Sequence, residues 1–189
     1  MRSSGTPWVI LSLVSIAAAA VPASASFHAF GVNEVYSDPS GNVQFIELHE
    51  RFGTDFEGFF TGISIVSNAH TYTFQTDLPS QSTANKFVLL GTADYAAIPG
   101  VPAPNFTIPA SFFNPAGDTL TYGGFADTIT FGAVPANPLQ SLNRSGDTMI
   151  PASATPTDFA GDSGSVPEPT GVAVLAVAGV LLVRRRRVR

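Results

Sequence analysis

The chain has 189 residues, no cysteine and a formal net charge of −5. Without cysteine there are no disulfides and no thiol chemistry, so a folded domain must be stable from its hydrophobic core alone. Residues 26–169 hold three basic and all fourteen acidic residues, and their net charge of −11 argues against a nucleic-acid partner, because phosphate binding depends on clustered lysine and arginine.

The first 25 residues have the organisation of a signal peptide. Arg2 precedes an apolar stretch over residues 8–20, and the segment ends in Ala23-Ser24-Ala25. Signal peptidase accepts small side chains in this Ala-x-Ala pattern, which predicts cleavage after Ala25. We therefore expect the chain to be exported, with signal peptidase as a transient partner and a mature domain that starts near Ser26.

The central part of the chain is predicted to be all-β. Short runs rich in β-branched and aromatic residues alternate with turn signals, and no convincing helix lies among them. Residues 38–42 are typical of a tight turn between the first two strands, and residues 67–70 are expected to join the next pair. This punctuation favours an antiparallel β-sandwich over a barrel or a propeller. The predicted strands cover residues 27–36, 43–50, 62–67, 71–75, 86–91, 119–122, 128–131 and 141–144.

Several segments lack a strand pattern. Residues 78–85 are polar and residues 98–104 contain three prolines, so both are predicted to be loops. Phe112-Phe113-Asn114-Pro115 is expected to form an apolar plug that ends in a turn, because proline cannot continue a β-ladder. Residues 147–165 consist mostly of Ser, Thr, Pro, Ala, Asp and Gly and are predicted to form a flexible spacer.

The opening of the central domain resembles that of a lamin-tail domain. Asn33-Glu34 leads through a turn into Gln44-Phe45-Ile46-Glu47-Leu48, and Ser141-Leu142-Asn143-Arg144 resembles the closing strand of that family. The resemblance implies an immunoglobulin-like antiparallel β-sandwich over residues 26–146, in a class of domains that scaffold and bind more than they catalyse. The tryptophan that such domains often carry is missing, because Trp8 lies in the signal peptide.

Few residues point to catalysis or to metal binding. His49-Glu50 resembles the start of a metalloprotease helix motif, but the second histidine of that motif is missing. His28, His49 and His70 show no ligand spacing, and the chain has no nucleophile elbow and no phosphate-binding glycine loop. We predict no catalytic residue, no cofactor and no metal. The alternative to the last is a calcium ion held loosely by Asp38 and Asn42 or by the acids of the tail.

Glu47 is expected to be structural. Glu47 and Glu50 fall on opposite faces of a strand, so they cannot act as a catalytic carboxylate pair unless a bulge intervenes. In such a strand, the Glu47 carboxylate would accept hydrogen bonds from a neighbouring loop or would pair with Arg144.

Residues 52–60 combine aromatic side chains with acids and glycines. A lid folded over one end of the sandwich is favoured for this segment, with an exposed binding loop as the alternative. Core packing explains most of the 15 phenylalanines of the chain, and their excess over tyrosine and tryptophan argues against a sugar-binding surface. The four phenylalanines of the segment are Phe52, Phe56, Phe59 and Phe60.

The C-terminal residues 166–189 carry the most informative motif. Val166-Pro167-Glu168-Pro169 precedes an apolar run over residues 171–183, which is followed by four basic residues, Arg184, Arg185, Arg186 and Arg187. This order of parts resembles the PEP-CTERM sorting signal, which implies recognition and removal by an exosortase-type membrane peptidase. The apolar run makes a helix of about 20 Å against roughly 30 Å of bilayer hydrocarbon, so it is predicted to span the membrane only transiently, with the arginines in the cytoplasm. An ordinary short membrane anchor is the alternative.

Together these features predict a non-catalytic exported protein. It would pass through an inner-membrane intermediate and then reach the outer envelope or the extracellular matrix of a Gram-negative bacterium, where its acidic sandwich would bind or space matrix components such as exopolysaccharide. A secreted hydrolase, or a ligand-binding module such as a carbohydrate-binding one, is the alternative, with a site assembled from residues far apart in sequence.

Overall fold

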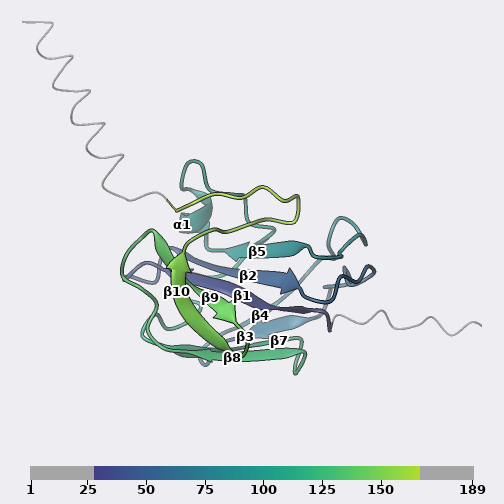
Figure 1. Cartoon of the computed structure of the whole chain (residues 1–189), viewed down its shortest axis with the longest axis horizontal. Helices are drawn as coiled ribbons and strands as arrows, with labels where there is room; N and C mark the ends of the chain where they lie inside the picture. Colours follow the sequence, from purple (N-terminus) through teal and green to yellow (C-terminus); the bar gives the residue numbers. More distant parts are fainter. Residues whose placement is uncertain (1–27, 167–189) are drawn as a thin grey trace, which may run out of the picture.

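Residues 28–166 are described by a computed structural model, in which they form two stacked β-sheets (Figure 1). The first sheet has six strands in the order β10-β9-β1-β2-β5-β6, and the second has four in the order β4-β3-β7-β8. Neighbouring strands are antiparallel except for β5 and β6, which run parallel. The predicted two-sheet, all-β architecture is therefore confirmed.

All eight predicted strands are present, and the structure adds β6 and β10. The six-stranded sheet is formed by β1 (Phe30–Ser37), β2 (Gln44–Glu50), β5 (Phe87–Gly91), β6 (Phe106–Thr107), β9 (Gln140–Ser145) and β10 (Thr148–Ser153). The four-stranded sheet is formed by β3 (Ser64–Val66), β4 (Thr71–Thr73), β7 (Asp118–Tyr122) and β8 (Asp127–Phe131). Within residues 28–166 the one helix is α1 (Ala93–Ala96), and no helix there is long and apolar enough to cross a membrane.

The main core lies between the two sheets. Alternate residues of β2 and β5 point toward the second sheet, and four of them have no exposed surface: Ile46, Leu48, Val88 and Leu90. The predicted apolar plug is also confirmed, because Phe112 and Phe113 are buried in the same core. The two segments predicted as loops, residues 78–85 and 98–104, contain no strand or helix.

Two predicted hairpin turns are confirmed. Between β1 and β2, the Asp38 carboxylate accepts a hydrogen bond from the Val43 amide at 3.1 Å, and Gly41 has a φ of +75°, which glycine adopts without a steric penalty. Between β3 and β4, the Ser67 hydroxyl accepts hydrogen bonds from the backbone amides of Ala69 and His70. Local side-chain acceptors thus close both turns.

A third layer covers the outer face of the six-stranded sheet. It consists of α1 and of residues 154–166, which we call the C-terminal strap, and Figure 1 shows both on the side of this sheet that faces away from the second sheet. Thr92 caps α1 by accepting a hydrogen bond from the Tyr95 amide at 3.2 Å. The layer buries a second apolar cluster of Tyr36, Phe45, Leu89, Tyr95, Ala154 and Val166.

The prediction of a flexible spacer over residues 147–165 is wrong. β10 pairs with β9 along six residues, and the strap that follows buries Ala154, Phe159 and Val166. The segment looked like a spacer because β10 is an edge strand with mostly exposed side chains and with proline at position 151, which an edge strand tolerates. The polar residues of the strap find their partners on the sheet beneath it.

Candidate functional site

Two buried glutamates lie side by side under the C-terminal strap. Glu34 on β1 and Glu47 on β2 are cross-strand neighbours on the outer face of the six-stranded sheet, and each is 1% exposed. The β1–β2 register shifts between Val32 and Glu34, and this bulge turns Glu34 to the outer face while Val32 and Val35 stay in the core. A carboxylate pair therefore exists, but the partner of Glu47 is Glu34 and not the Glu50 considered in the sequence.

Hydrogen bonds from the strap and from the strands β1 and β9 satisfy both carboxylates. Glu34 Oε1 accepts from the Ser141 hydroxyl at 2.6 Å and from the Thr155 amide at 2.9 Å. Glu47 accepts from Asn33 Nδ2 at 2.6 Å and from the Thr157 amide at 2.7 Å. The prediction that Glu47 accepts hydrogen bonds from a loop is confirmed, whereas the alternative pairing of Glu47 with Arg144 does not occur.

Burial sets the protonation of this pair. It raises the pKa of Glu47 to about 8, and the neighbouring charge of Glu34 adds to this effect, while the hydrogen bonds from Asn33 and Thr157 oppose it. Burial also raises the pKa of Glu34. Tyr95 lies in the same layer, where burial raises its pKa and its hydroxyl has no hydrogen-bond partner. Near neutral pH the pair therefore holds a proton that an exposed pair would have released.

Strongly shifted carboxyls often mark active sites, but structural networks shift pKa values as well. Here each glutamate is covered by the strap, and its oxygens accept hydrogen bonds from the chain itself. A shallow cleft of about 420 Å³ lies elsewhere, and residues 37–40, 114–116 and 134–136 line it. The geometry of the pair is that of a clamp holding the strap against the sheet.

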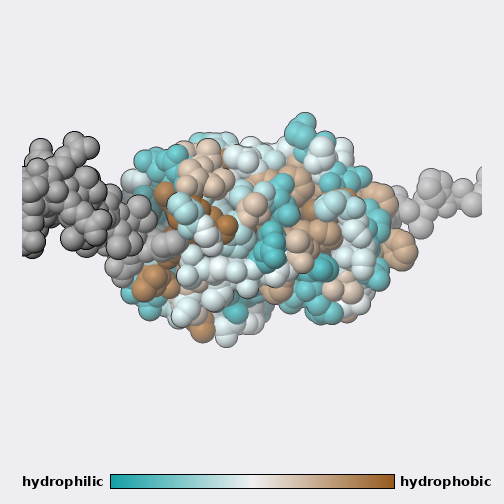
Figure 2. All heavy atoms as spheres, turned by 90° about the horizontal axis from the view of Figure 1, so that it is seen from above, coloured by the Kyte–Doolittle hydropathy of each residue, from teal (hydrophilic) through white to brown (hydrophobic). Residues whose placement is uncertain are grey.

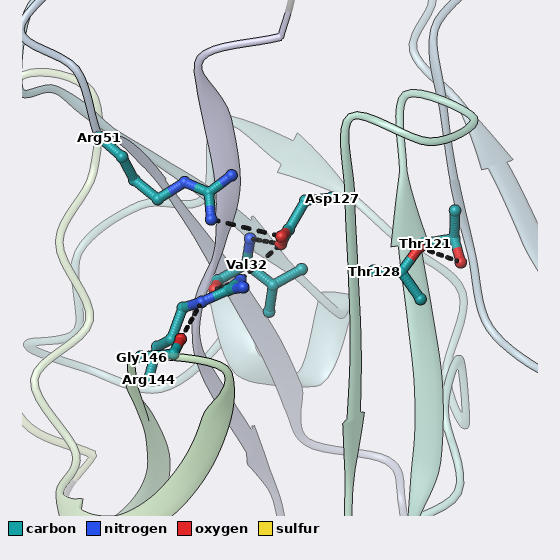
Figure 3. A network of polar contacts seen from close by, with 7 residues as sticks. All are labelled: Val32, Arg51, Thr121, Asp127, Thr128, Arg144 and Gly146. Carbon is teal, nitrogen blue, oxygen red and sulfur yellow. Dashed lines mark hydrogen bonds and ion pairs between the residues drawn. The ribbon is translucent and has the colours of Figure 1, made fainter.

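A second polar cluster joins the two sheets at one end of the sandwich (Figure 3). Asp127 on β8 accepts from Arg144 Nη1 at 2.6 Å, from Arg51 Nη1 at 3.3 Å and from the Val32 amide at 2.8 Å. Arg144 also donates to the Val32 carbonyl at 3.0 Å and to the Gly146 carbonyl at 2.9 Å. Since Val32 lies at the β1 bulge, Asp127 supplies the acceptor for its amide, and the cluster ties the second sheet to β1 and β9.

The loop over residues 52–60 is ordered by a third glutamate. The buried carboxylate of Glu50 accepts from the amides of Phe52, Gly53 and Asn85 and from the Thr54 hydroxyl, at 2.8–2.9 Å. Burial acts to raise the pKa of Glu50, but the hydrogen bonds outweigh it, so the pKa lies below the usual value. The loop is therefore fixed to the sheet end by an ionised carboxylate.

The prediction that residues 52–60 form a lid is wrong for three of the four phenylalanines. Phe60 is fully buried, but Phe52, Phe56 and Phe59 are 69%, 68% and 43% exposed. Hydrogen bonds from the amides of Thr83 and Ala84 to the Asp55 carboxylate hold the loop against this neighbouring segment. From the sequence, an exposed loop was only the alternative to the lid, because composition does not distinguish a buried phenylalanine from an exposed one.

Most of the predicted sorting residues lie outside the described part of the chain. These are Ala25, Pro167, Glu168, Pro169, Arg184, Arg185, Arg186 and Arg187. Val166 is described and is buried against Tyr36, Phe45, Leu89, Tyr95 and Ala154. The predicted sorting motif therefore starts on a residue that belongs to the folded domain, with no free spacer before Pro167.

The three histidines do not come together. His49 stacks on Phe87 with 4.4 Å between ring centroids, His70 Nδ1 lies 3.2 Å from the Phe112 carbonyl, and His28 is at the exposed start of the described chain. Among residues 28–166 there is no group of three or more His, Cys, Asp or Glu side chains that could hold a metal ion.

Comparisons with protein-family models, with curated proteins and with solved structures find no match to this chain.

Proposed function

We propose that this chain is an exported, non-catalytic protein that is delivered by a PEP-CTERM-type sorting signal and that binds or spaces matrix components. The observation that carries the proposal is the order of parts from Val166 to the four arginines at 184–187, preceded at the other end of the chain by a signal peptide. Signal peptidase and an exosortase-type peptidase are its transient partners. The destination is the outer envelope or extracellular matrix of a Gram-negative bacterium.

The use of the buried carboxylates supports a role without catalysis. Glu34 and Glu47 hold the C-terminal strap, Glu50 holds the loop over residues 52–60, and Asp127 joins the two sheets. Three of these four acids have a shifted pKa, and the fourth has ion-pair partners. The carboxylate oxygens of all four make contacts that stabilise the fold. A general acid or base must instead reach a substrate atom within hydrogen-bonding distance.

Within the two-sheet class, we propose that the fold is an immunoglobulin-like sandwich of the lamin-tail type. The residues that carry the resemblance contact one another across the sheet. Ser141 donates to Glu34, Asn33 donates to Glu47, and β9, which contains Ser141, pairs with β1. The separate motifs that carry the resemblance are therefore in contact in the fold. If each motif matched by chance, no such contact would be expected.

The strap gives the proposed sorting a specific geometry. Because Val166 is packed into the outer cluster, the cleavage motif is tethered within one residue of the folded domain. A membrane peptidase that acts at Pro167-Glu168-Pro169 must then approach the face of the domain that carries α1 and the strap. Variants that loosen the strap are expected to be processed faster than the wild-type chain.

The test is the location of the protein in a bacterium that has an exosortase-type peptidase. The wild-type chain should reach the matrix fraction, and a chain with Pro167, Glu168 and Pro169 replaced by alanine should remain with the inner membrane. A matched control replaces Asp162, Ser163 and Ser165, whose side chains are exposed shortly before the motif, by alanine and should reach the matrix. Matrix localisation of the Pro-Glu-Pro variant would contradict the proposal.

A further inference from the structure

The exposed phenylalanines of the described domain gather at one end of the sandwich, which we call the aromatic end: Phe52, Phe56, Phe59 and Phe125. Phe125 is 98% exposed at the tip of the β7–β8 hairpin. This tip lies beside residues 52–60, because the Gly123 amide donates to the Ser64 carbonyl at the start of β3, and Arg51 pairs with Asp127 next to the hairpin. Figure 2 shows apolar residues at this end, beside the start of the described chain.

The backbone of the aromatic end is held in place before any partner binds. Glu50 and Asp55 accept six hydrogen bonds within residues 52–54 and 83–85. The Thr83 hydroxyl donates to the Thr54 carbonyl at 2.9 Å. A preformed loop loses little conformational freedom when a ligand binds, and this favours affinity.

Phe56 combines exposure with an unfavourable backbone. Its φ is +69°, a region that bulky side chains rarely adopt and that glycine adopts freely. Its side chain is 68% exposed, so packing in the core does not offset this strain. Strain of this kind persists where the surrounding structure enforces it, and it concentrates at binding sites.

The aromatic end lies opposite the point where the described chain leaves the domain. Figure 1 shows β2 running toward the end at which the described chain begins, while the strap leaves from the other end, near α1. Under the proposed sorting, a chain held at the membrane by its C-terminal signal would present the aromatic end away from the bilayer. This orientation favours a matrix partner over the membrane as the occupant.

The negative charge of the domain limits the kinds of matrix partner that it can bind. Residues 28–166 hold thirteen acidic and three basic residues, so an anionic polymer or a second copy of the domain would be repelled. The phenylalanines are also separated by polar side chains, among them the exposed Thr54 and Asp55, and do not form one continuous apolar patch. A partner that offers alternating CH faces and hydroxyl groups, without charge, matches this surface.

We infer that the aromatic end binds an uncharged polysaccharide. Sugar rings stack through their CH faces on Phe52 and Phe56, and the polar groups between the two rings bind the sugar hydroxyls. Phenylalanine supplies the flat apolar face, and Thr54 and Asp55 supply the polar handle that tyrosine or tryptophan carries within one side chain. The inference deepens the proposed matrix function and rests on it.

The test is affinity electrophoresis of the purified mature protein in gels that contain a soluble glucan, mannan or galactan. At least one of these uncharged polymers should retard the wild-type protein. The double variant Phe52→Ser with Phe56→Gly should bind at least about tenfold more weakly, since two stacking contacts are lost. Its unfolding midpoint should not fall, because glycine suits the positive φ at position 56.

A matched control distinguishes binding at the aromatic end from nonspecific binding by any exposed apolar side chain. Ile150→Thr removes an exposed apolar side chain from β10 and should leave binding unchanged. Wild-type retardation by none of the three polymers, equal binding by the double variant, or stronger binding to a uronic-acid polymer or to anionic vesicles would each overturn the inference. These outcomes leave the sorting test unaffected, because localisation depends on residues 166–187 and the gel assay uses protein that has already been purified.

Discussion

Replacing Glu47 by glutamine should remove a loss of stability that the wild-type chain shows as the pH rises toward 8. Because the pKa of Glu47 is raised to about 8 in the folded state, the folded chain binds more protons than the unfolded chain between pH 4.5 and pH 8. The resulting stability is fully present below the unfolded pKa and is lost as the pH rises through the folded pKa. The shift corresponds to about 5 kcal/mol at about 1.4 kcal/mol per pH unit. Local opening of the strap would hydrate the carboxylate and so limits the measured loss, which we expect to be about 2 kcal/mol.

The glutamine variant lacks this titration. One of its amide hydrogens must face either Asn33 Nδ2 or the Thr157 amide, both of which are donors, so the variant should be less stable than wild type by about 1 kcal/mol at pH 5. At pH 8 it should be the more stable of the two. The two stability curves should therefore cross between these values.

The assay is denaturant unfolding of the mature protein at several pH values, followed by circular dichroism. The difference between wild type and variant cancels titrating groups outside the Glu34–Glu47 pair, such as His49, whose lowered pKa makes the fold more stable as the pH rises toward about 6.5. Asp147→Asn removes an exposed carboxylate in the β9–β10 turn and serves as the control. Parallel curves for wild type and Glu47→Gln would refute the assignment of a buried proton to the pair.

Two further substitutions test the core and the link between the sheets. Ile46→Ala should destabilise the fold by about 2–5 kcal/mol in denaturant unfolding, since Ile46 is fully buried, and a loss below about 0.5 kcal/mol would show that β2 faces the other way. Asp127→Ala leaves the partly buried Arg144 without its carboxylate partner and should cost about 3 kcal/mol, whereas Asp147→Ala should change stability by less than about 0.5 kcal/mol. Equal effects of the two aspartate substitutions would contradict the role given to the Asp127 cluster.

The strands and turns could be predicted because their signals are local. In β2, Ile46 and Leu48 alternate with Glu47 and His49, and this alternation indicates the face that meets the second sheet. Asp38 and Gly41 mark the turn before the strand. The structural role of Glu47 also followed from its position in such a strand. The strand and turn signals depend on residues that lie within a few positions of one another.

The C-terminal strap could not be predicted because its partners are distant. Thr155 and Thr157 bond to glutamates that lie 121 and 110 residues away in the sequence. Composition alone describes residues 147–165 as a polar spacer, since it does not reveal buried acceptors on another element. The strap is visible only when β1 and β2 are placed beneath it.

The aromatic end shows a different limit. Phe56 and Phe60 belong to the same short segment, yet one is 68% exposed and the other is fully buried. What separates them is the loop conformation set by Glu50 and by residues 83–85. The nearby glycines and acids were the available signal for an exposed loop, but the lid remained the favoured interpretation.

The most direct test of the account is the intact mass of the exported protein from a host that has an exosortase-type peptidase and from a strain that lacks it. The account predicts a mature chain that starts near Ser26 and ends near Pro167-Glu168-Pro169 in the first host. In the second strain the chain should keep its C-terminal segment. Matrix protein from the first host that still carries Arg184, Arg185, Arg186 and Arg187 would contradict the central claim.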